Sequence, residues 1–197
     1  MTGAVPGPDG LLRCGWGESA DDYRVYHDTE WGRPVQGDDA LFERVSLEAF
    51  QSGLSWITIL RRREGFRAAF AGFAIAEVAE FGPDDVERLV QDTGIIRNRA
   101  KIEATLANAR AARDLDGGLS ALIWGFAPAR GGPAPRTLAE VPAVTPESTA
   151  LAKELRKQGF RFVGPTTAYA LMQACGLVDD HLVDCHVRGA GTAQRPV

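Results

Sequence analysis

The rarest ligand-type residues of this sequence gather near its end. The chain has three histidines and three cysteines, and three of these six side chains fall in the stretch "HLVDCH" at residues 181–186. Residues four apart lie on one face of a helix, so His181 and Cys185 could share a metal ion, whereas His186 would point elsewhere. The tail therefore supplies two metal ligands, with His186 as a bystander.

A structural zinc site normally takes four protein ligands, so the other two must come from elsewhere in the chain. Cys175 lies in the apolar stretch "ALMQACGL", where a thiol usually packs in the core. The economical prediction is one structural zinc ion bound by Cys14, His27, His181 and Cys185, which would tie the first ordered segment to the last. The alternative is a buried thiol with histidines scattered over the surface.

Aromatic residues are concentrated between residues 16 and 56, which contain three of the four tryptophans. Such density is usual for a core, but it can also line a slot that stacks a flat ligand such as a nucleobase. The candidate base-binding residues are Trp16, Tyr23, Tyr26, Trp31 and Trp56.

One acidic residue interrupts an apolar helix face in "LFERVSLEAF". At 100° per residue, Glu48 lies on the same side as Leu41 and Val45, so its carboxylate points toward the interior. Burying a carboxylate without a partner is expensive. Glu48 therefore either pairs with a nearby arginine or receives a ligand that donates hydrogen bonds or carries positive charge.

Two loops have the chemistry of a DNA-binding surface. In "QSGLSW", Gly53 precedes Leu54 at a helix junction, and an exposed apolar tip of this kind can insert into a base stack. In "GFRFVGPTT", a helix beginning after Gly164 would present the free N–H groups of Thr166 and Thr167 to a phosphate. The alternatives are an ordinary helix-start contact and a helix connection that needs glycine to turn.

These residues must be positioned by helices, because no stretch alternates apolar and polar residues as a strand does. The sequence predicts an all-α fold of roughly eight or more short helices, with helix starts before residues 83 and 146. Residues 12–190 are expected to form a single domain, with two helical subdomains and the base pocket between them as one possible arrangement. Residues 1–11 and 191–197 are expected to be flexible ends.

Composition sets the class of protein. The net charge of −4 argues against a histone-like protein that coats DNA, but it permits a local basic face that binds DNA. No stretch approaches the ~20 apolar residues of a membrane span, and the first residues lack a secretion signal. Three cysteines do not suggest a disulfide scaffold. We expect a cytoplasmic monomer with no membrane association.

Several segments together resemble one family, the bacterial DNA-3-methyladenine glycosylases I. The resemblance covers roughly residues 12–186 and rests on "RCGW", "YHDTEWG", "GLSWITIL", "DVERLVQDTGIIRNRAKI", "GFRFVG" and "LMQACGLVDDH". It implies an all-α helix-hairpin-helix DNA glycosylase fold with a structural zinc ion joining the N- and C-terminal segments. It also implies base excision repair by flipping 3-methyladenine out of alkylated double-stranded DNA and hydrolysing its N-glycosidic bond.

The resemblance places individual roles on residues of this chain. It puts the zinc ligands on Cys14, His27, His181 and Cys185, and the base pocket on Glu48, Trp56, Tyr23 and Tyr26, with Trp16 and Trp31 nearby. The intercalating residue falls on Leu54. This sequence has Ala170 where a small polar residue is expected in the pocket, so one hydrogen bond is missing.

Two other interpretations compete with this one. Asp179 stands two residues before His181, where related glycosylases carry a catalytic aspartate, so the chain could act on another lesion through Asp179. With His181 assigned to zinc, we expect Asp179 to be structural. The second competitor is a non-catalytic zinc and DNA-binding module, which leaves Glu48 and the aromatic slot without a role.

Overall fold

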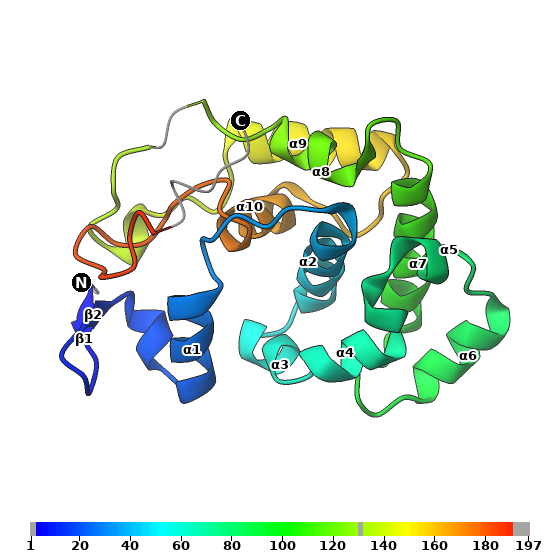
Figure 1. Ribbon diagram of the computed structural model, residues 1–197, viewed down its shortest axis with the longest axis horizontal. Coiled ribbons are helices and arrows are strands. Elements are labelled where there is room, and N and C mark those ends of the chain that lie inside the picture. Colours follow the sequence, from blue (N-terminus) through cyan, green and yellow to red (C-terminus); the bar gives the residue numbers. More distant parts are fainter. Residues whose placement is uncertain (1–2, 130–131, 191–197) are drawn as a thin grey trace.

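Helices dominate the residues that the structure describes, which are residues 3–129 and 132–190 of a computed structural model (Figure 1). The α-helices in these ranges are α1 (Asp21–Thr29), α2 (Asp38–Gln51), α3 (Trp56–Leu60), α4 (Arg63–Ala69), α5 (Ile75–Ala79), α6 (Pro83–Gln91), α7 (Arg99–Arg113), α8 (Gly118–Trp124), α9 (Pro146–Lys157) and α10 (Pro165–Ala174). Three short 3-10 helices accompany them: η1 (Gly15–Glu18), η2 (Ala71–Phe73) and η3 (Leu138–Glu140). The predicted predominance of helix is confirmed, while the predicted flexible end at 191–197 lies outside the described residues.

Local sequence signals fix where several helices begin. Pro83 opens α6, at a position where its missing N–H costs nothing. Before α7, the Asn98 side chain accepts the backbone N–H of Lys101 at 3.2 Å. Before α9, Thr145 and Ser148 exchange side-chain and backbone hydrogen bonds, which satisfies two N–H groups that a helix start leaves unpaired.

The N-terminal segment is more regular than its sequence predicts. Strand β1 (Val5–Pro6) pairs antiparallel with β2 (Leu12–Arg13). The buried Arg13 guanidinium holds this hairpin, because it forms ion pairs with Asp9 at 2.7 Å and with Asp28 on α1 at 2.8 Å. The glycine- and proline-rich stretch therefore contains a short hairpin with a long-range anchor, which its local sequence does not reveal.

Helix α2 runs through the middle of the main core. It packs against α3, α7, α8 and α10, and most of its length is buried. Fully buried phenylalanines fill the space beside it, and each contributes ~1.5–3 kcal/mol through burial of apolar surface. They are Phe42, Phe50, Phe66, Phe70 and Phe73. A central helix buried on several sides carries any polar residue on it into the interior.

A second, smaller core joins the two ends of the described chain. Cys14, Leu182 and Cys185 form a buried cluster separate from the main core. The orange and red segment after α10 lies beside β1 and β2 in Figure 1, and the His186 N–H donates to the Leu12 carbonyl at 2.9 Å. The N- and C-terminal segments are therefore held together, as predicted.

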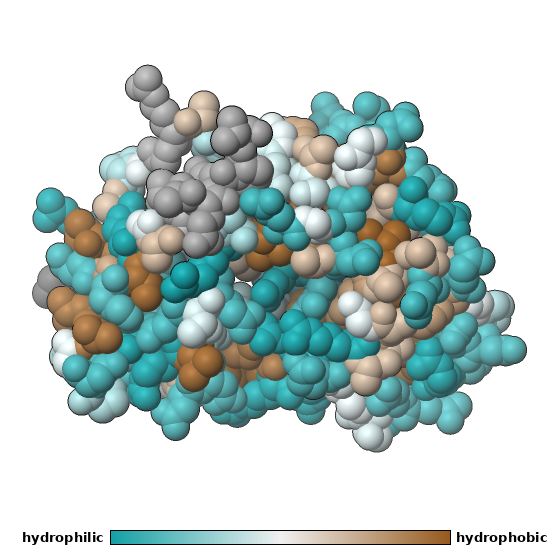
Figure 2. All heavy atoms as spheres, in the orientation of Figure 1, coloured by the Kyte–Doolittle hydropathy of each residue, from teal (hydrophilic) through white to brown (hydrophobic). Residues whose placement is uncertain are grey.

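The surface is mostly polar on the face that Figure 2 shows, where hydrophobic side chains form small, separate patches. Every helix in the described ranges is too short or too polar to cross a membrane. The exposed large apolar side chains are scattered over several elements, and they include Leu54 after α2 and Phe162 between α9 and α10.

Candidate functional site

A cavity of about 220 Å³ lies between α1, α2, α3 and α10. Its walls are mostly aromatic, and one carboxylate stands among them. The lining residues are Trp16, Tyr23, Tyr26, Trp31, Glu48, Gln51, Trp56, Ala170 and Gln173. The structure thus brings together all six residues that the sequence places in a base pocket.

The aromatic rings brace one another around this cavity. The Tyr26 ring lies 5.5 Å from that of Trp56, and the Trp16 ring meets Trp31 edge to face at 5.1 Å. The Tyr23 hydroxyl accepts the backbone N–H of Ile57 at 2.8 Å, which fixes the start of α3 and with it Trp56. Rigid aromatic walls of this kind suit a flat, ring-shaped ligand.

Glu48 is buried at the cavity wall, with 5% of its surface exposed. The nearby Arg44, one turn earlier on α2, bonds Glu30 instead, because its Nη2 donates to that carboxylate at 3.0 Å. Among the residues that the structure describes, its buried Nη1 has no hydrogen-bond partner. Burial raises the pKa of Glu48 from 4.5 to about 8, and the positive charge of Arg44 offsets this only in part. The structure therefore answers the question raised by the sequence, because the carboxylate is not paired with an arginine.

Two lining residues, Gln51 and Gln173, escaped the sequence analysis. Each lies three positions after a residue already assigned to the pocket, Glu48 and Ala170 respectively, so helical spacing was the available signal. The Gln173 amide donates to Asp180 at 2.8 Å. A carboxylate only accepts hydrogen bonds, so the NH₂ group of Gln173 must face Asp180 and its amide oxygen must face away. That oxygen can then accept a hydrogen bond from a ligand. The Ala170 side chain offers no hydrogen bond.

The candidate DNA-binding residues lie outside the cavity. Gly53, with a φ of 82°, and Leu54, which is 40% exposed, follow the end of α2. Gly164 precedes α10, and Thr166 and Thr167 lie in its first turn, as predicted. The N–H groups of that turn have no partner within the helix, because only the fourth and later residues reach a carbonyl.

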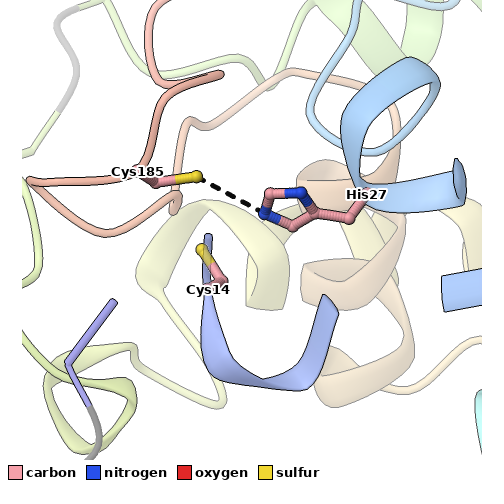
Figure 3. Close-up of side chains that lie close together, drawn as sticks. All are labelled: Cys14, His27 and Cys185. Carbon is pink, nitrogen blue, oxygen red and sulfur yellow. Dashed lines mark hydrogen bonds between the residues drawn. The ribbon is translucent and has the colours of Figure 1, made fainter. Parts of the chain in front are cut away.

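Cys14, His27 and Cys185 converge in the small core between the chain ends (Figure 3). Their ligand atoms all lie within 4.8 Å of one another, and the Cys185 Sγ is 3.4 Å from Nε2 of His27. Hydrogen bonds from Cys14 and then from His27 lower the pKa of the Cys185 thiol, which favours a thiolate. Thiolate sulfur and imidazole nitrogen are the ligands that zinc prefers.

His181 lies beside this cluster rather than within it. Its ring centre is 5.1 Å from that of His27, and its Nε2 atom is buried without a hydrogen-bond partner in the described part of the chain. The Nδ1 atom donates to Asp179 at 2.9 Å, just as Nδ1 of His27 donates to Asp28 at 2.8 Å. Both imidazoles are thus held by a carboxylate with Nε2 left as the ligand atom, the usual arrangement around a bound metal.

The fit of a metal ion can be tested on the unpaired Nε2 atom of His181. A buried nitrogen without a partner costs free energy, and a fourth bond to a shared ion would remove that cost. Gly32, with a φ of 77°, packs against the same ring, and a Cβ there would lie 2.6 Å from His181 Cε1. The four predicted ligands therefore fit one ion in their donor chemistry, with three of them already converged.

Comparison with known proteins identifies the family. The family model for methyladenine glycosylase matches residues 16–188, almost the whole described chain. This chain belongs to the methyladenine glycosylase family. DNA-3-methyladenine glycosylase 1 of Escherichia coli (strain K12) is 48% identical over 183 residues, which cover 89% of this chain and 96% of that protein.

Solved structures of the same family have the same fold. A crystal structure of a 3-methyladenine DNA glycosylase I superposes with a TM-score of 0.86 at 44% identity, covering 89% of this chain and 99% of the other. The Staphylococcus aureus 3-methyladenine DNA glycosylase I, described for its recognition of 3-methyladenine, gives a TM-score of 0.85 at 32% identity and covers 89% and 96%. The methyladenine glycosylase match includes every residue that lines the cavity and, of the predicted metal ligands, leaves out only Cys14.

Proposed function

We propose that this methyladenine glycosylase hydrolyses the N-glycosidic bond of 3-methyladenine in alkylated double-stranded DNA, as a step of base excision repair. It would act in the cytoplasm as a monomer. The observation that carries the proposal is the buried carboxylate of Glu48 in an aromatic cavity, for which residues 3–129 and 132–190 supply no hydrogen bond or ion pair. Such a site favours a flat ligand with positive charge or hydrogen-bond donors. A 3-methylated adenine in DNA is a flat cation with an exocyclic amine.

Selectivity follows from the cost of burying Glu48. Burial in the cavity wall raises the pKa of its carboxyl group, so a neutral adenine would meet a largely protonated, uncharged group at neutral pH. A cationic base stabilises the carboxylate and recovers the free energy lost to desolvation. Glu48 then accepts hydrogen bonds from the amine edge, while Trp56 and Tyr26 pack on the ring faces.

The chemistry that remains for the protein is modest, because methylation already weakens the glycosidic bond. The base departs as a neutral molecule when the bond from its N9 to C1′ breaks. Water then forms the new bond to C1′ and releases a proton to solvent. The protein must flip the nucleotide and hold it away from the duplex.

Two loops outside the cavity would hold the distorted DNA. Leu54, exposed after Gly53, would fill the gap left by the flipped nucleotide. The first turn of α10, with Gly164, Thr166 and Thr167, would bind a phosphate near the abasic sugar through backbone N–H groups. This connection between α9 and α10 would then act as the hairpin of a helix-hairpin-helix element.

We further propose that Cys14, His27, His181 and Cys185 hold one structural zinc ion. Four protein ligands leave no position for an activated water, so the ion would contribute stability rather than chemistry. Its site adjoins the pocket, because the Trp31 ring meets the His181 ring at 4.6 Å and the Trp16 ring meets His27 at 5.1 Å. The ion would therefore brace one aromatic wall.

Asp179 does not favour the rival glycosylase chemistry. Its Oδ1 accepts from the ring and the backbone N–H of His181, and its Oδ2 accepts the Gly189 N–H at 2.9 Å. A carboxylate bonded at both oxygens is a poor general base. A non-catalytic zinc and DNA-binding module, in turn, gives no reason for a buried carboxylate without a bonding partner.

The proposal is tested by identifying the bases that the protein releases. Methylated duplex DNA is incubated with the protein, and the free bases are separated and quantified. We expect release of 3-methyladenine and no release of adenine or 7-methylguanine. Release of unmodified adenine at a similar rate would show that Glu48 does not provide the expected selectivity for a cationic base, and no release of any base would support the binding module.

A further inference from the structure

Helix α7 carries three buried polar side chains, Lys101, Thr105 and Asn108, which belong neither to the cavity nor to the metal cluster. Thr105 bonds within the helix, to the Lys101 carbonyl at 3.0 Å, whereas the other two bond other segments. Lys101 is 8% exposed and Asn108 is 1% exposed. They are seven residues apart, so they lie on nearly the same face, roughly 10 Å apart along the helix axis. A buried ammonium and a buried amide persist only where hydrogen bonds compensate their desolvation.

Lys101 is bonded to the end of α2. Its Nζ atom donates to the Phe50 carbonyl at 2.8 Å and to the Ser52 carbonyl at 2.6 Å. Carbonyls at a helix C-terminus lack helical partners and carry partial negative charge, so a cation there is stabilising. Gly53 and Leu54 follow immediately, and the ammonium therefore fixes the point from which the exposed Leu54 side chain projects.

Asn108 is bonded to the turn between α9 and α10. Its amide donates to the Arg161 carbonyl at 3.1 Å and accepts the Arg161 N–H at 2.7 Å. The next residue, Phe162, has a φ of 56° and is 43% exposed. A left-handed backbone at a residue with a side chain is unfavourable and persists only where its surroundings fix it. Asn108 supplies part of that fixation.

Resting on the proposed function, we propose that α7 sets the separation of the two DNA-contacting loops, with Lys101 and Asn108 as its positioning residues. Near its start, the helix holds the loop that carries Leu54 through Lys101, and two turns later it holds the turn that leads into α10 through Asn108. The Leu54 side chain and the phosphate-binding first turn of α10 would act on the same distorted duplex. Fixing their spacing before binding lowers the cost of ordering both loops on the DNA. Neither residue touches the base or the reacting bond.

A role confined to folding would give a different result from a role exerted through Leu54. In the folding case, loss of Lys101 weakens binding equally whether or not the Leu54 side chain is present. In the positioning case, Lys101 acts by holding the Leu54 side chain in place. Once that side chain is removed, the loss of Lys101 has little further effect, so the losses of duplex affinity in the two single variants do not add. A double-mutant cycle separates these cases.

The cycle uses Lys101→Met, Leu54→Ala and the double variant, with affinity for a duplex containing a stable abasic-site analogue as readout. We expect Lys101→Met to weaken duplex binding about tenfold, the size of a lost charge-assisted hydrogen bond. In the Leu54→Ala background, the additional loss should stay within about twofold. Binding of free 3-methyladenine should be unchanged, because the cavity is untouched. An equal loss in both backgrounds, or a matching loss of free-base binding, overturns the proposal for Lys101.

Asn108→Leu tests the other end of α7, and Arg99→Met is the matched control. Arg99 pairs with the exposed Glu87 at 2.9 Å, so its loss removes a charge from the same helix without touching either loop. We expect Asn108→Leu to weaken duplex binding in both the wild-type and the Leu54→Ala backgrounds, because it acts through the other loop, and Arg99→Met to have no effect. Binding of free 3-methyladenine by Asn108→Leu should be unchanged, and a matching loss of free-base binding would show a role confined to folding and overturn the proposal for Asn108. Equal effects of Asn108→Leu and Arg99→Met overturn the proposal for Asn108.

Melting temperatures show which variants are folded, and Lys101→Gln and Asn108→Asp replace any variant that is not. The wild type separates this inference from the proposed function. If the wild type binds the abasic duplex but releases no 3-methyladenine, the proposed glycosylase activity is contradicted. The positioning role of α7 is then still tested by the double-mutant cycle. A wild type that does not bind the duplex overturns both.

Discussion

Arg44 and Glu48 lie one helical turn apart on α2, yet Arg44 donates to Glu30 and leaves Glu48 without a salt bridge. Arg63 also bonds Glu30, at 2.6 Å, so two arginines converge on one carboxylate at the edge of the pocket. Glu30 thus draws Arg44 away from the partner that helical spacing would give it. The unpaired state of Glu48, on which the proposed recognition of a cationic base depends, is maintained from outside the cavity.

Replacing Glu30 should therefore weaken the enzyme through Glu48. In Glu30→Gln, Arg44 is free to turn toward Glu48 and neutralise it, which removes the advantage of a cationic ligand. We expect about tenfold slower release of 3-methyladenine from methylated duplex DNA under single-turnover conditions. Glu43→Gln is the matched control, because it removes an ion pair with Arg67 on the other side of α2. Equal activity of the two variants would contradict the role of Glu30.

The buried Glu48 should also make stability depend on pH. Its pKa is raised from 4.5 to about 8, so the folded protein holds a proton that the unfolded chain releases. This contribution is fully present below pH 4.5 and is lost as the pH rises through 8. Relative to wild type, Glu48→Gln should gain on the order of 3 kcal/mol in the free energy of unfolding between pH 5 and pH 8. Urea denaturation at the two pH values measures this gain, and a constant difference would show that Glu48 is not protonated in the fold.

Removing the proposed zinc ion should reduce stability and spare the chemistry. Chelation should lower the melting temperature by roughly 10 °C, the effect of a ligand bound well above its dissociation constant. Release of 3-methyladenine by the protein that remains folded should persist at low temperature. Loss of activity at an unchanged melting temperature would contradict the structural role.

The identity of the fourth ligand can be tested separately by metal content. His181→Ala should lower the zinc bound per chain after dialysis, because it removes the unpaired Nε2 atom. His186→Ala is the control, since this neighbouring ring bonds the Leu12 carbonyl at 3.0 Å and is not expected to bind metal. Retention of zinc by His181→Ala and its loss from His186→Ala would reverse the assignment.

Asp179 should matter for the metal cluster more than for catalysis. Asp179→Asn keeps an oxygen near the His181 ring but weakens the bond that orients it, and such losses typically reduce metal affinity about 10- to 100-fold. With zinc in excess, we expect little change in the rate of 3-methyladenine release. A large loss of rate with a full complement of zinc would favour the alternative chemistry in which Asp179 acts directly.

The sequence indicates which residues line the cavity better than it indicates the contacts that hold those residues in place. Periodicity alone predicts that Glu48 points inward. The scarcity of histidine and cysteine points to Cys14, His27 and Cys185, which come from opposite ends of the chain and lie together in the structure. The pairing of Arg44 with Glu30 depends on how α2 meets the segment after α1, which local pattern does not encode. Lys101 reads as an ordinary polar position on α7, and only the packed structure shows that its ammonium reaches the end of α2.

The same limit explains the N-terminal hairpin. A glycine- and proline-rich stretch reads as flexible when each residue is weighed by its local preference. Its order comes from Arg13, whose guanidinium is buried among carboxylates from separate segments. Such multi-partner contacts are tertiary, so they become visible only with the fold.

The central claim is that the Glu48 carboxylate recognises the charge and the amine edge of the lesion. The most direct test is the single-turnover rate at which Glu48→Gln, a nearly isosteric change, releases 3-methyladenine from methylated duplex DNA. We predict a rate about 10- to 100-fold below that of the wild type, the worth of a charge-assisted hydrogen bond in a buried site. A folded Glu48→Gln variant that releases 3-methyladenine at the wild-type rate would contradict the account.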